Sequence, residues 1–344
     1  MMPILPMRKV TSLMTSIRRT DWAEATSLIQ SAQKILIVTH VSPDGDAFGS
    51  MLGLANGLRS LGKDVDCAVD GGVDSYMAFL PNSDLVHSKL TEGEWDVMIS
   101  TDSSDEPRTG DCGAYGRAHS QKVINLDHHA TNTMFGDVFL VDSIAVSATE
   151  IAFRWLETMN LPLDTAIALP LLTGLVTDTL GFRTSNVTAD TLSIAQKLIG
   201  AGASLAEVTA RTLDNRPFDA LLVWRYALAT AELHEGGLLS AHVTLEDAHR
   251  VGMTEANDLG LVGFLVKVDE AIIAVVFKEV EGGKINVSMR AKSGFNVSGV
   301  AFALGGGGHV QAAGATVDGT LDEVKARVIP MLIEAAKQGT LTIG

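Results

Sequence analysis

Brief apolar runs alternate with longer stretches of helical periodicity through the first half of the chain. Four of the runs are short and bounded by polar residues, as buried strands are: KILIVTH (34–40), DVDCAV (64–69), WDVMIST (95–101) and KVINLD (122–127). Three longer segments have the length and apolar spacing of helices: 47–62, 147–160 and 165–179. The alternation predicts a mostly parallel sheet flanked by helices.

Two of the predicted helices carry local signals. Ser147 and Glu150 form the Ser-x-x-Glu pattern of a capping box at the start of the helix over 147–160. Pro170 lies inside 165–179, where its missing N–H group predicts a local fault in the helix.

The pattern changes beyond residue 200. Residues 204–233 predict one or two helices, and residues 321–338 predict a closing helix. Between them lie three predicted strands, the last two joined by a likely hairpin turn at Glu-Gly-Gly (281–283): LLSAHVTL (238–245), EAIIAVVFKEV (270–280) and KINVSMRA (284–291). We therefore expect an α/β protein with a first domain over 18–200, a helical connector over 201–234 and a smaller α/β domain over 235–344.

Composition narrows the class of protein. The 344 residues favour two domains, and no apolar run is long enough to span a membrane. The two cysteines form no CxxC motif, so we expect a reduced, cytoplasmic protein. The net charge of −15 argues against a protein that tracks along nucleic acid, which needs a basic groove. A small phosphorylated substrate remains compatible if carboxylates hold divalent cations.

Acidic and histidine residues gather where the predicted strands end. His40, Asp44 and Asp46 lie within seven residues, with Gly45 expected to allow a tight backbone between the carboxylates. A turn followed by a helix N-cap would explain this segment equally well. The later members of the set are Asp102, Asp127, His128, His129 and Asp178. Because carboxyl ends of parallel strands share one edge of a sheet, we expect these side chains to meet there.

The pair His128–His129 has two interpretations. Both residues could lie in a polar loop without a chemical role. Alternatively, adjacent residues at a strand end point to opposite sides, so one imidazole could bind a metal while the other faces a substrate. Asp127 could then orient a ligand. The whole set suits two metal ions that share one carboxylate, manganese or magnesium before zinc, as in enzymes that hydrolyse phosphoesters.

A glycine run in the second half could bind an anion. Gly307 and Gly308 close the run and His309 follows, so the backbone amides are free to cradle a phosphate. We expect a helix over 309–315, whose N-terminus would attract phosphate further. Arg290, at a predicted strand end, could donate two hydrogen bonds to a phosphate. A flexible loop and an ordinary surface arginine are the alternatives.

Five segments together resemble the DHH phosphoesterase superfamily with its DHH-associated C-terminal domain: VTHVSPDGDAFGS, STDSSD, NLDHHATN, GLVTDTLGFRTSN and GGGGHVQAAGA. Within it, they are most similar to the bifunctional oligoribonucleases and 3′-phosphoadenosine-5′-phosphate phosphatases. The resemblance implies two metal ions with Asp102 as the shared ligand, one held also by His40 and Asp44, the other also by Asp46, His128 and Asp178. Two positions depart from the family pattern, since Leu180 stands where glycine is expected and Val187 where threonine is frequent.

The resemblance also implies roles for the remaining residues. Asp127 would support a ligand, and His129 would face the scissile phosphate. The glycine run, His309 and Arg290 would bind substrate phosphate across a cleft between the domains, where the active site would lie.

The function expected from this resemblance is that of a metal-dependent phosphoesterase. It would degrade very short oligonucleotides to mononucleotides and convert 3′-phosphoadenosine-5′-phosphate to AMP. Two Mn²⁺ ions are expected, with Mg²⁺ or Co²⁺ as substitutes. Its partners would be these substrates, without long nucleic acid or membrane, and a homodimer is allowed.

Three alternatives stay open. The first is a soluble phosphodiesterase of cyclic or linear dinucleotides. The second is a manganese-dependent pyrophosphatase, disfavoured because this chain has GGGGH where that class carries a lysine- and arginine-rich motif. The third is a non-catalytic nucleotide-binding protein, disfavoured because no expected metal ligand is missing.

Overall fold

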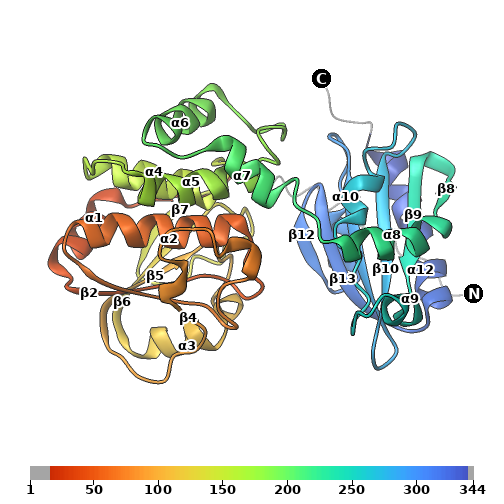
Figure 1. Ribbon diagram of the computed structural model, residues 1–344, viewed down its shortest axis with the longest axis horizontal. Coiled ribbons are helices and arrows are strands. Elements are labelled where there is room, and N and C mark those ends of the chain that lie inside the picture. Colours follow the sequence, from red (N-terminus) through yellow and green to blue (C-terminus); the bar gives the residue numbers. More distant parts are fainter. Residues whose placement is uncertain (1–15, 340–344) are drawn as a thin grey trace, which may run out of the picture. The chain divides into compact units, whose positions relative to one another are not determined.

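The computed structural model describes residues 16–339 and divides into two compact units, with the boundary between Asn215 and Arg216 (Figure 1). Both units are of mixed α/β type, as the alternation of apolar runs predicts. No helix within the described range is long and apolar enough to cross a membrane.

The first unit is built on a seven-stranded sheet with the order β1-β7-β6-β5-β2-β3-β4. Every pairing is parallel except that of β1 with β7. The strands are β1 (Arg18–Thr20), β2 (Lys34–Val38), β3 (Asp64–Ala68), β4 (Val86–His87), β5 (Trp95–Thr101), β6 (Ser120–Asp127) and β7 (Val138–Asp142). The prediction of a mostly parallel sheet is therefore confirmed.

Helices cover both faces of this sheet (Figure 1). One face packs against α3, through a cluster that includes Leu36, Met98 and Cys112. The other face belongs to the main core, where Ile37, Ile99 and Leu126 lie beneath α2, α4 and α5. The helices are α1 (Trp22–Ser31), α2 (Gly45–Ser60), α3 (Gly110–Ala118), α4 (Ala148–Thr158), α5 (Thr165–Asp178), α6 (Ala189–Gly200) and α7 (Leu205–Thr212).

Glycines spaced four residues apart let α2 approach α5 closely. A Cβ atom on Gly49 would lie 2.6 Å from the carbonyl oxygen of Pro170, and one on Gly45 would lie 2.4 Å from Oγ1 of Thr177. Gly45 therefore serves close helix contact, whereas the sequence suggested a need for unusual backbone freedom. The contacts run antiparallel, so the N-terminus of α2 lies beside the C-terminus of α5. Pro170 is accommodated inside α5 without ending it.

The second unit contains a six-stranded sheet with the order β12-β13-β11-β10-β9-β8. Only β9 and β10 pair in parallel. Its strands are β8 (Glu232–His234), β9 (Leu238–Val243), β10 (Ile273–Val280), β11 (Lys284–Ala291), β12 (Gly307–His309) and β13 (Ala312–Asp318). Its helices are α8 (Phe218–Ala229), α9 (Leu245–Arg250), α10 (Leu261–Leu265), α11 (Ser298–Ala303) and α12 (Leu321–Gln338).

The second unit has two apolar layers. Val300 of α11 and Val328 of α12 pack on one face of its sheet, beside Val287. Val223 of α8 and Leu261 of α10 pack on the opposite face. The segment 201–234, expected as a connector, is split by the boundary, because α7 lies in the first unit and α8 in the second.

The helix predicted over 309–315 is absent from the described structure, and a β-hairpin takes its place. β13 pairs with β11 from Lys284 to Arg290, while β12 pairs with the first residues of β13. Ala313, Ala315 and Val317 alternate into the core. Every second side chain of this segment is thus buried, as in a β-strand, and this burial prevails over the preference of alanine for a helix.

Candidate metal centre

Three adjacent strands deliver the acidic and histidine side chains to one edge of the first sheet. His40 follows β2, Asp102 follows β5 directly, and Asp127 is the last residue of β6. These strands are neighbours and parallel, so their carboxyl ends coincide. Asp46 in the first turn of α2 and Asp178 at the end of α5 meet there because these helices pack antiparallel.

His128 stands among three carboxylates. Its Nε2 atom lies 3.6 Å from Oδ1 of Asp102, 3.6 Å from Oδ2 of Asp178 and 3.8 Å from Oδ2 of Asp46. On the other side of Asp102, Oδ2 lies 3.5 Å from Nε2 of His40. These separations exceed a normal hydrogen bond and suit ligands that surround a cation.

The donor atoms form three overlapping groups in which all atoms lie within 4.8 Å of one another: His40–Asp44–Asp102, Asp46–His128–Asp178 and Asp102–His128–His129. The first two match the sets implied by the sequence motifs, except that Asp102 is not part of the second. All the predicted ligand residues are therefore brought together in the first unit.

Helix N-termini hold the two aspartates of α2 in place. Asp44 caps α2, and its Oδ1 accepts hydrogen bonds from the backbone N–H groups of Asp46 and Ala47 at 3.0 and 3.1 Å. Asp46 is fully buried and accepts from the first amides of α4, at Ala148 (2.6 Å) and Thr149 (3.0 Å). Positive helix ends thus support both carboxylates. The two amides of α4 carry no signal in the sequence.

The start of α4 differs slightly from the predicted capping box. The Ser147 hydroxyl accepts from the backbone N–H of Glu150 at 3.1 Å, as expected. The Glu150 carboxylate instead accepts from the backbone N–H of Val146 at 3.1 Å. The helix start that supports Asp46 is therefore fixed from both sides.

A chain of side chains orients His129. Its Nδ1 lies 2.7 Å from Oδ1 of Asp127, whose Oδ2 accepts a hydrogen bond from Asn132 at 2.6 Å. Asn132 was not singled out from the sequence, although it closes the same motif. The expectation that the two imidazoles point to opposite sides is wrong, since their ring centroids are 4.7 Å apart and Nδ1 of His129 also lies 3.6 Å from Asp102. Alternation fails because β6 ends at Asp127.

Burying these ionised carboxylates together costs free energy when no cation is bound. It raises the pKa of Asp102 well above its usual range, and the neighbouring Asp46 and Asp44 charges raise it further. Burial and the same two neighbours also raise the pKa of Asp178 strongly. Burial lowers the pKa of His40, which favours the neutral imidazole that a metal requires.

The donor set fits divalent cations. Oδ1 of Asp102 is buried and has no hydrogen-bond partner within residues 16–339. Asp178 ends α5, where the negative end of the helix dipole disfavours another negative charge. Carboxylates with some imidazole and without thiolate suit manganese or magnesium.

Left-handed backbone occurs at Asp102 and in the segment that follows Asp178. Asp102 has φ of 54°, and Leu180, Gly181 and Phe182 follow one another at 51°, 75° and 63°. Such conformations cost free energy in residues other than glycine and tend to occur at functional sites. Leu180, where the family pattern has glycine, therefore keeps the backbone conformation that glycine would favour.

The predicted phosphate-binding residues lie in the second unit. Arg290 is in β11, its Nη1 donates to the carbonyl oxygen of Met289 at 2.9 Å, and burial lowers its pKa. Arg290 and His309 both pair with Ala312 in the sheet register, although the His309 side chain lies outside the described part. Gly307 and Gly308 belong to β12, so no helix N-terminus contributes there.

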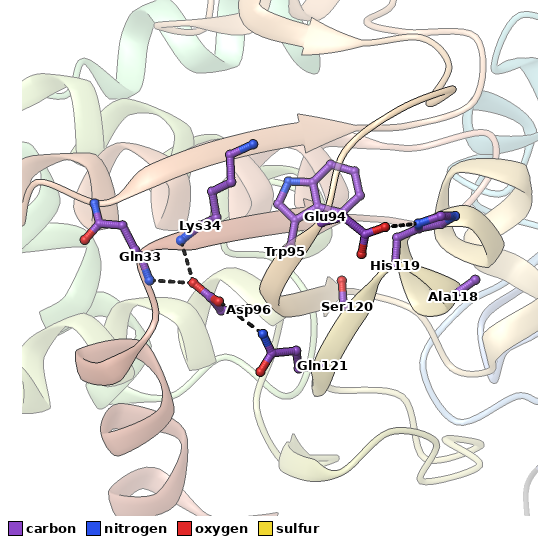
Figure 2. Close-up of a pocket in the computed structure, with 9 residues that line it drawn as sticks. All are labelled: Gln33, Lys34, Glu94, Trp95, Asp96, Ala118, His119, Ser120 and Gln121. Carbon is purple, nitrogen blue, oxygen red and sulfur yellow. Dashed lines mark hydrogen bonds and ion pairs between the residues drawn. The ribbon is translucent and has the colours of Figure 1, made fainter.

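A separate hollow of ≈ 430 Å³ lies in the first unit (Figure 2). Its lining includes Lys34, Trp95 and Ser120, the first residues of β2, β5 and β6. It is therefore at the amino ends of the strands whose carboxyl ends carry the metal-binding cluster. Asp96 there accepts from the backbone N–H groups of Gln33 and Lys34 at 2.8 and 2.9 Å, so its carboxylate serves the loop structure.

Comparison with known protein families gives two matches. The N-terminal domain of the DHH family matches residues 34–175, and the DHHA1 domain matches residues 245–338.

Two relatives of similar length carry the same name. A bifunctional oligoribonuclease and PAP phosphatase from Thermus thermophilus is 38% identical over 306 residues, which are 87% of this chain and 89% of that protein. A protein of the same name from Bacillus subtilis is 29% identical over 82% of this chain and 89% of its own length.

Solved structures share the fold. An exopolyphosphatase-related protein from Bacteroides fragilis has a TM-score of 0.83 at 24% identity, covering 93% of this chain and 96% of its own. RecJ from Thermus thermophilus in complex with Mn²⁺ has a TM-score of 0.53 at 15% identity, covering 94% of this chain and 56% of its own.

Proposed function

This chain belongs to the DHH family, and from that membership we propose that it is a phosphoesterase that hydrolyses very short oligonucleotides to mononucleotides. The relatives named as bifunctional enzymes extend the proposal to 3′-phosphoadenosine-5′-phosphate, with AMP as product. The observation that carries the proposal is the buried cluster around Asp102, where carboxylates and imidazoles of four chain segments converge.

We assign two divalent cations to this cluster, Mn²⁺ before Mg²⁺ or Co²⁺. His40, Asp44 and Asp102 would hold one, and a second set would hold the other: Asp46, Asp102, His128 and Asp178. When bound, such ions neutralise charge on phosphoryl oxygens and activate the attacking water. The overlapping donor groups support this assignment, and so does Oδ1 of Asp102, which accepts no hydrogen bond from the described residues.

His129 is the proposed general acid. Its Nδ1 is held by Asp127, so Nε2 is the ring atom assigned to the leaving oxygen of the substrate. Burial would raise the pKa of Asp127, but the hydrogen bond and charge of His129 hold it below the usual range. Asp127 therefore stays ionised and keeps the imidazole oriented.

Arg290 and the strand from Gly307 to His309 are proposed to bind the part of the substrate that does not react. The described second unit offers no cluster of metal-binding groups, so its role would be recognition. If a phosphate of the substrate is bound there, only a short further part of the substrate can react. This arrangement would favour dinucleotide-sized substrates. The net charge of −15 agrees with a protein that does not bind long nucleic acid.

One panel of substrates tests the proposal. Purified protein with Mn²⁺ would be incubated separately with a dinucleotide, a pentanucleotide, 3′-phosphoadenosine-5′-phosphate, a cyclic dinucleotide and pyrophosphate. We expect turnover of the first three, fastest for the dinucleotide. Turnover of the cyclic dinucleotide or pyrophosphate alone would contradict the proposed function.

A further inference from the structure

One face of the second sheet carries a trough that is polar at both ends and bare in the middle. Residues that pair across neighbouring strands present their side chains on the same face. Three successive rows have this composition: Arg290–Ala312 across β11 and β13, Ser288–Gly314–Gly307 across β11, β13 and β12, and Asn286–Thr316 across β11 and β13. The middle row therefore contributes mainly backbone to the floor of the trough.

The far end of the trough opens into a hollow of ≈ 470 Å³. Asn286, Thr316 and the run Gly305–Gly307 line it, together with Gly314 and Ala315. On β9 and β10 the same face is covered by apolar side chains of α8 and α10. Neither Asn286 nor Thr316 has a side-chain hydrogen bond to any residue in the described range. A ligand in the hollow would thus meet an amide that can both donate and accept.

The charges around the trough favour a neutral ligand group at this end. Lys278 donates to Oγ of Ser288 at 2.8 Å and pairs with Asp258 at 3.3 Å. The side chains of Lys278 and Asp258 are only 12% and 7% exposed, so the pair is internal and its charges compensate each other. Asn286 and Thr316 add no charge. The next row on this face, Lys284–Asp318, is an ion pair at 3.9 Å, so among the described residues a second phosphate would have to compete with a carboxylate for each nearby lysine. A flat heterocycle would instead find backbone and an amide.

We propose that this trough binds the nucleobase of the nucleotide whose phosphate Arg290 holds, with Asn286 pairing to the edge of the base. The inference rests on the proposed function for the role of Arg290. Positions 286 and 290 are four residues apart on one strand, roughly 13 Å, which is about the reach of a nucleotide from its phosphate to the far edge of its base. An asparagine amide pairs bidentately with N6 and N7 of adenine, so adenine is the expected preference.

The test measures binding without divalent cations, so that it does not depend on turnover. Isothermal titration of the full chain in chelator would compare AMP, UMP and ribose 5-phosphate, which lacks a base. We expect AMP to bind about tenfold more tightly than ribose 5-phosphate, as one bidentate amide–base pair provides, and UMP to fall between them. Asn286→Ala should remove most of the advantage of AMP and leave ribose 5-phosphate unchanged.

A second variant fills the floor of the trough. A Cβ atom on Gly307 has nothing within 4 Å, so Gly307→Ala fits the fold while intruding on the base. Gly299→Ala in α11 is the matched control, because it also has open space and lies outside the trough. We expect Gly307→Ala to weaken AMP several-fold more than ribose 5-phosphate and Gly299→Ala to weaken neither.

The outcomes separate this site from the proposed function. Equal affinity of the wild type for AMP and ribose 5-phosphate, or no detectable AMP binding at millimolar concentration, would overturn the base site. An advantage of AMP that survives Asn286→Ala and Gly307→Ala would overturn it as well. A protein that binds AMP through Asn286 yet hydrolyses no nucleotide would instead contradict the proposed function.

Discussion

Nε2 of His128 lies 3.6 Å from Oδ1 of Asp102, a buried oxygen without a hydrogen bond to any described residue. The separation suits two ligands of one cation, each about 2.0–2.2 Å from it. A carboxylate in this position repels its acidic neighbours until a cation arrives. The same residue therefore governs both the chemistry of the site and the stability of the metal-free protein.

Asp102→Asn should abolish most activity and lower the content of both metals. Asparagine tolerates the left-handed backbone at this position, where φ is 54°, so the fold should persist. We expect kcat/KM to fall more than about a hundredfold, beyond the range for losing a residue that only supports a ligand. Metal analysis after dialysis and a dinucleotide assay would check this. Near-normal rates with two metals bound would refute the bridging assignment.

The metal-free protein should lose stability as pH rises, through Asp102 and Asp178. Their pKa values are raised in the folded state, so the folded protein binds more protons than the unfolded chain above about pH 4. Folding then weakens from about pH 4 up through the raised pKa values. His40, with a lowered pKa, acts in the opposite direction.

Comparing wild type with Asp102→Asn isolates the carboxyl contribution. In chelator, Asp102→Asn should have the higher Tm, and the difference should grow between pH 5 and pH 8. Thermal unfolding followed by circular dichroism measures it. A difference that shrinks or reverses with pH would contradict the raised pKa of Asp102.

His129→Ala should slow hydrolysis while leaving the metal content close to normal. The Asp127–His129 pair at 2.7 Å holds the ring for proton transfer, which contributes typically 10²–10⁴-fold. His128→Ala is the natural control, since we expect it to lose metal as well as activity. Should His129→Ala release a metal ion, His129 would be a ligand and the roles of the two histidines would need to be exchanged.

Arg290→Ala should weaken recognition of substrates that carry a second phosphate. The lost charged hydrogen bonds are worth roughly 1.5–3 kcal/mol. The fall in kcat/KM should be large for a dinucleotide with a 5′-phosphate and small for bis-p-nitrophenyl phosphate, which has no second phosphate. An equal fall for both substrates would place Arg290 at the reacting phosphate.

Gly49→Ala should destabilise the first unit through the contact between α2 and α5. Its Cβ atom would lie 2.6 Å from the carbonyl oxygen of Pro170 and 2.8 Å from the backbone nitrogen of Gly174, which cannot simply move aside. Overpacking of this kind costs typically 1–3 kcal/mol. Gly200→Ala at the end of α6 meets nothing within 4 Å and serves as the control. An unchanged Tm for Gly49→Ala would mean that α2 and α5 can move apart without a measurable loss of stability.

Four strands of the first unit, β2, β3, β5 and β6, could be predicted closely because each is a short apolar run with a polar end. The short strands β1 and β4, and β7, were not predicted. The run Trp95–Thr101 has the predicted bounds, and Asp102 follows it directly. The cluster could be anticipated from one physical rule, that parallel strands share a carboxyl edge. The rule does not extend past the strand end, which is why the opposed orientation of His128 and His129 failed.

Long-range packing explains the other differences. Residues 309–315 are rich in alanine, yet 312–315 are strand because they pair with β11, and that pairing is not encoded locally. Glycine is an unfavourable residue inside a helix, and the spacing of the α2 glycines gains meaning only beside α5. The amides of Ala148 and Thr149 that hold Asp46 belong to the backbone, which no side-chain pattern reports.

The antiparallel pairing of α2 with α5 has a consequence for biosynthesis. Asp178, at the end of α5, emerges from the ribosome after every other member of the cluster in the first unit. Domains fold as units and the N-terminal part is made first, so a nascent chain displays His40, Asp102 and His128 before it can complete their surroundings. Because metal binding is coupled to folding, we expect full affinity only once α5 has docked along the glycines of α2. Metal binding would then report that α5 has packed against α2.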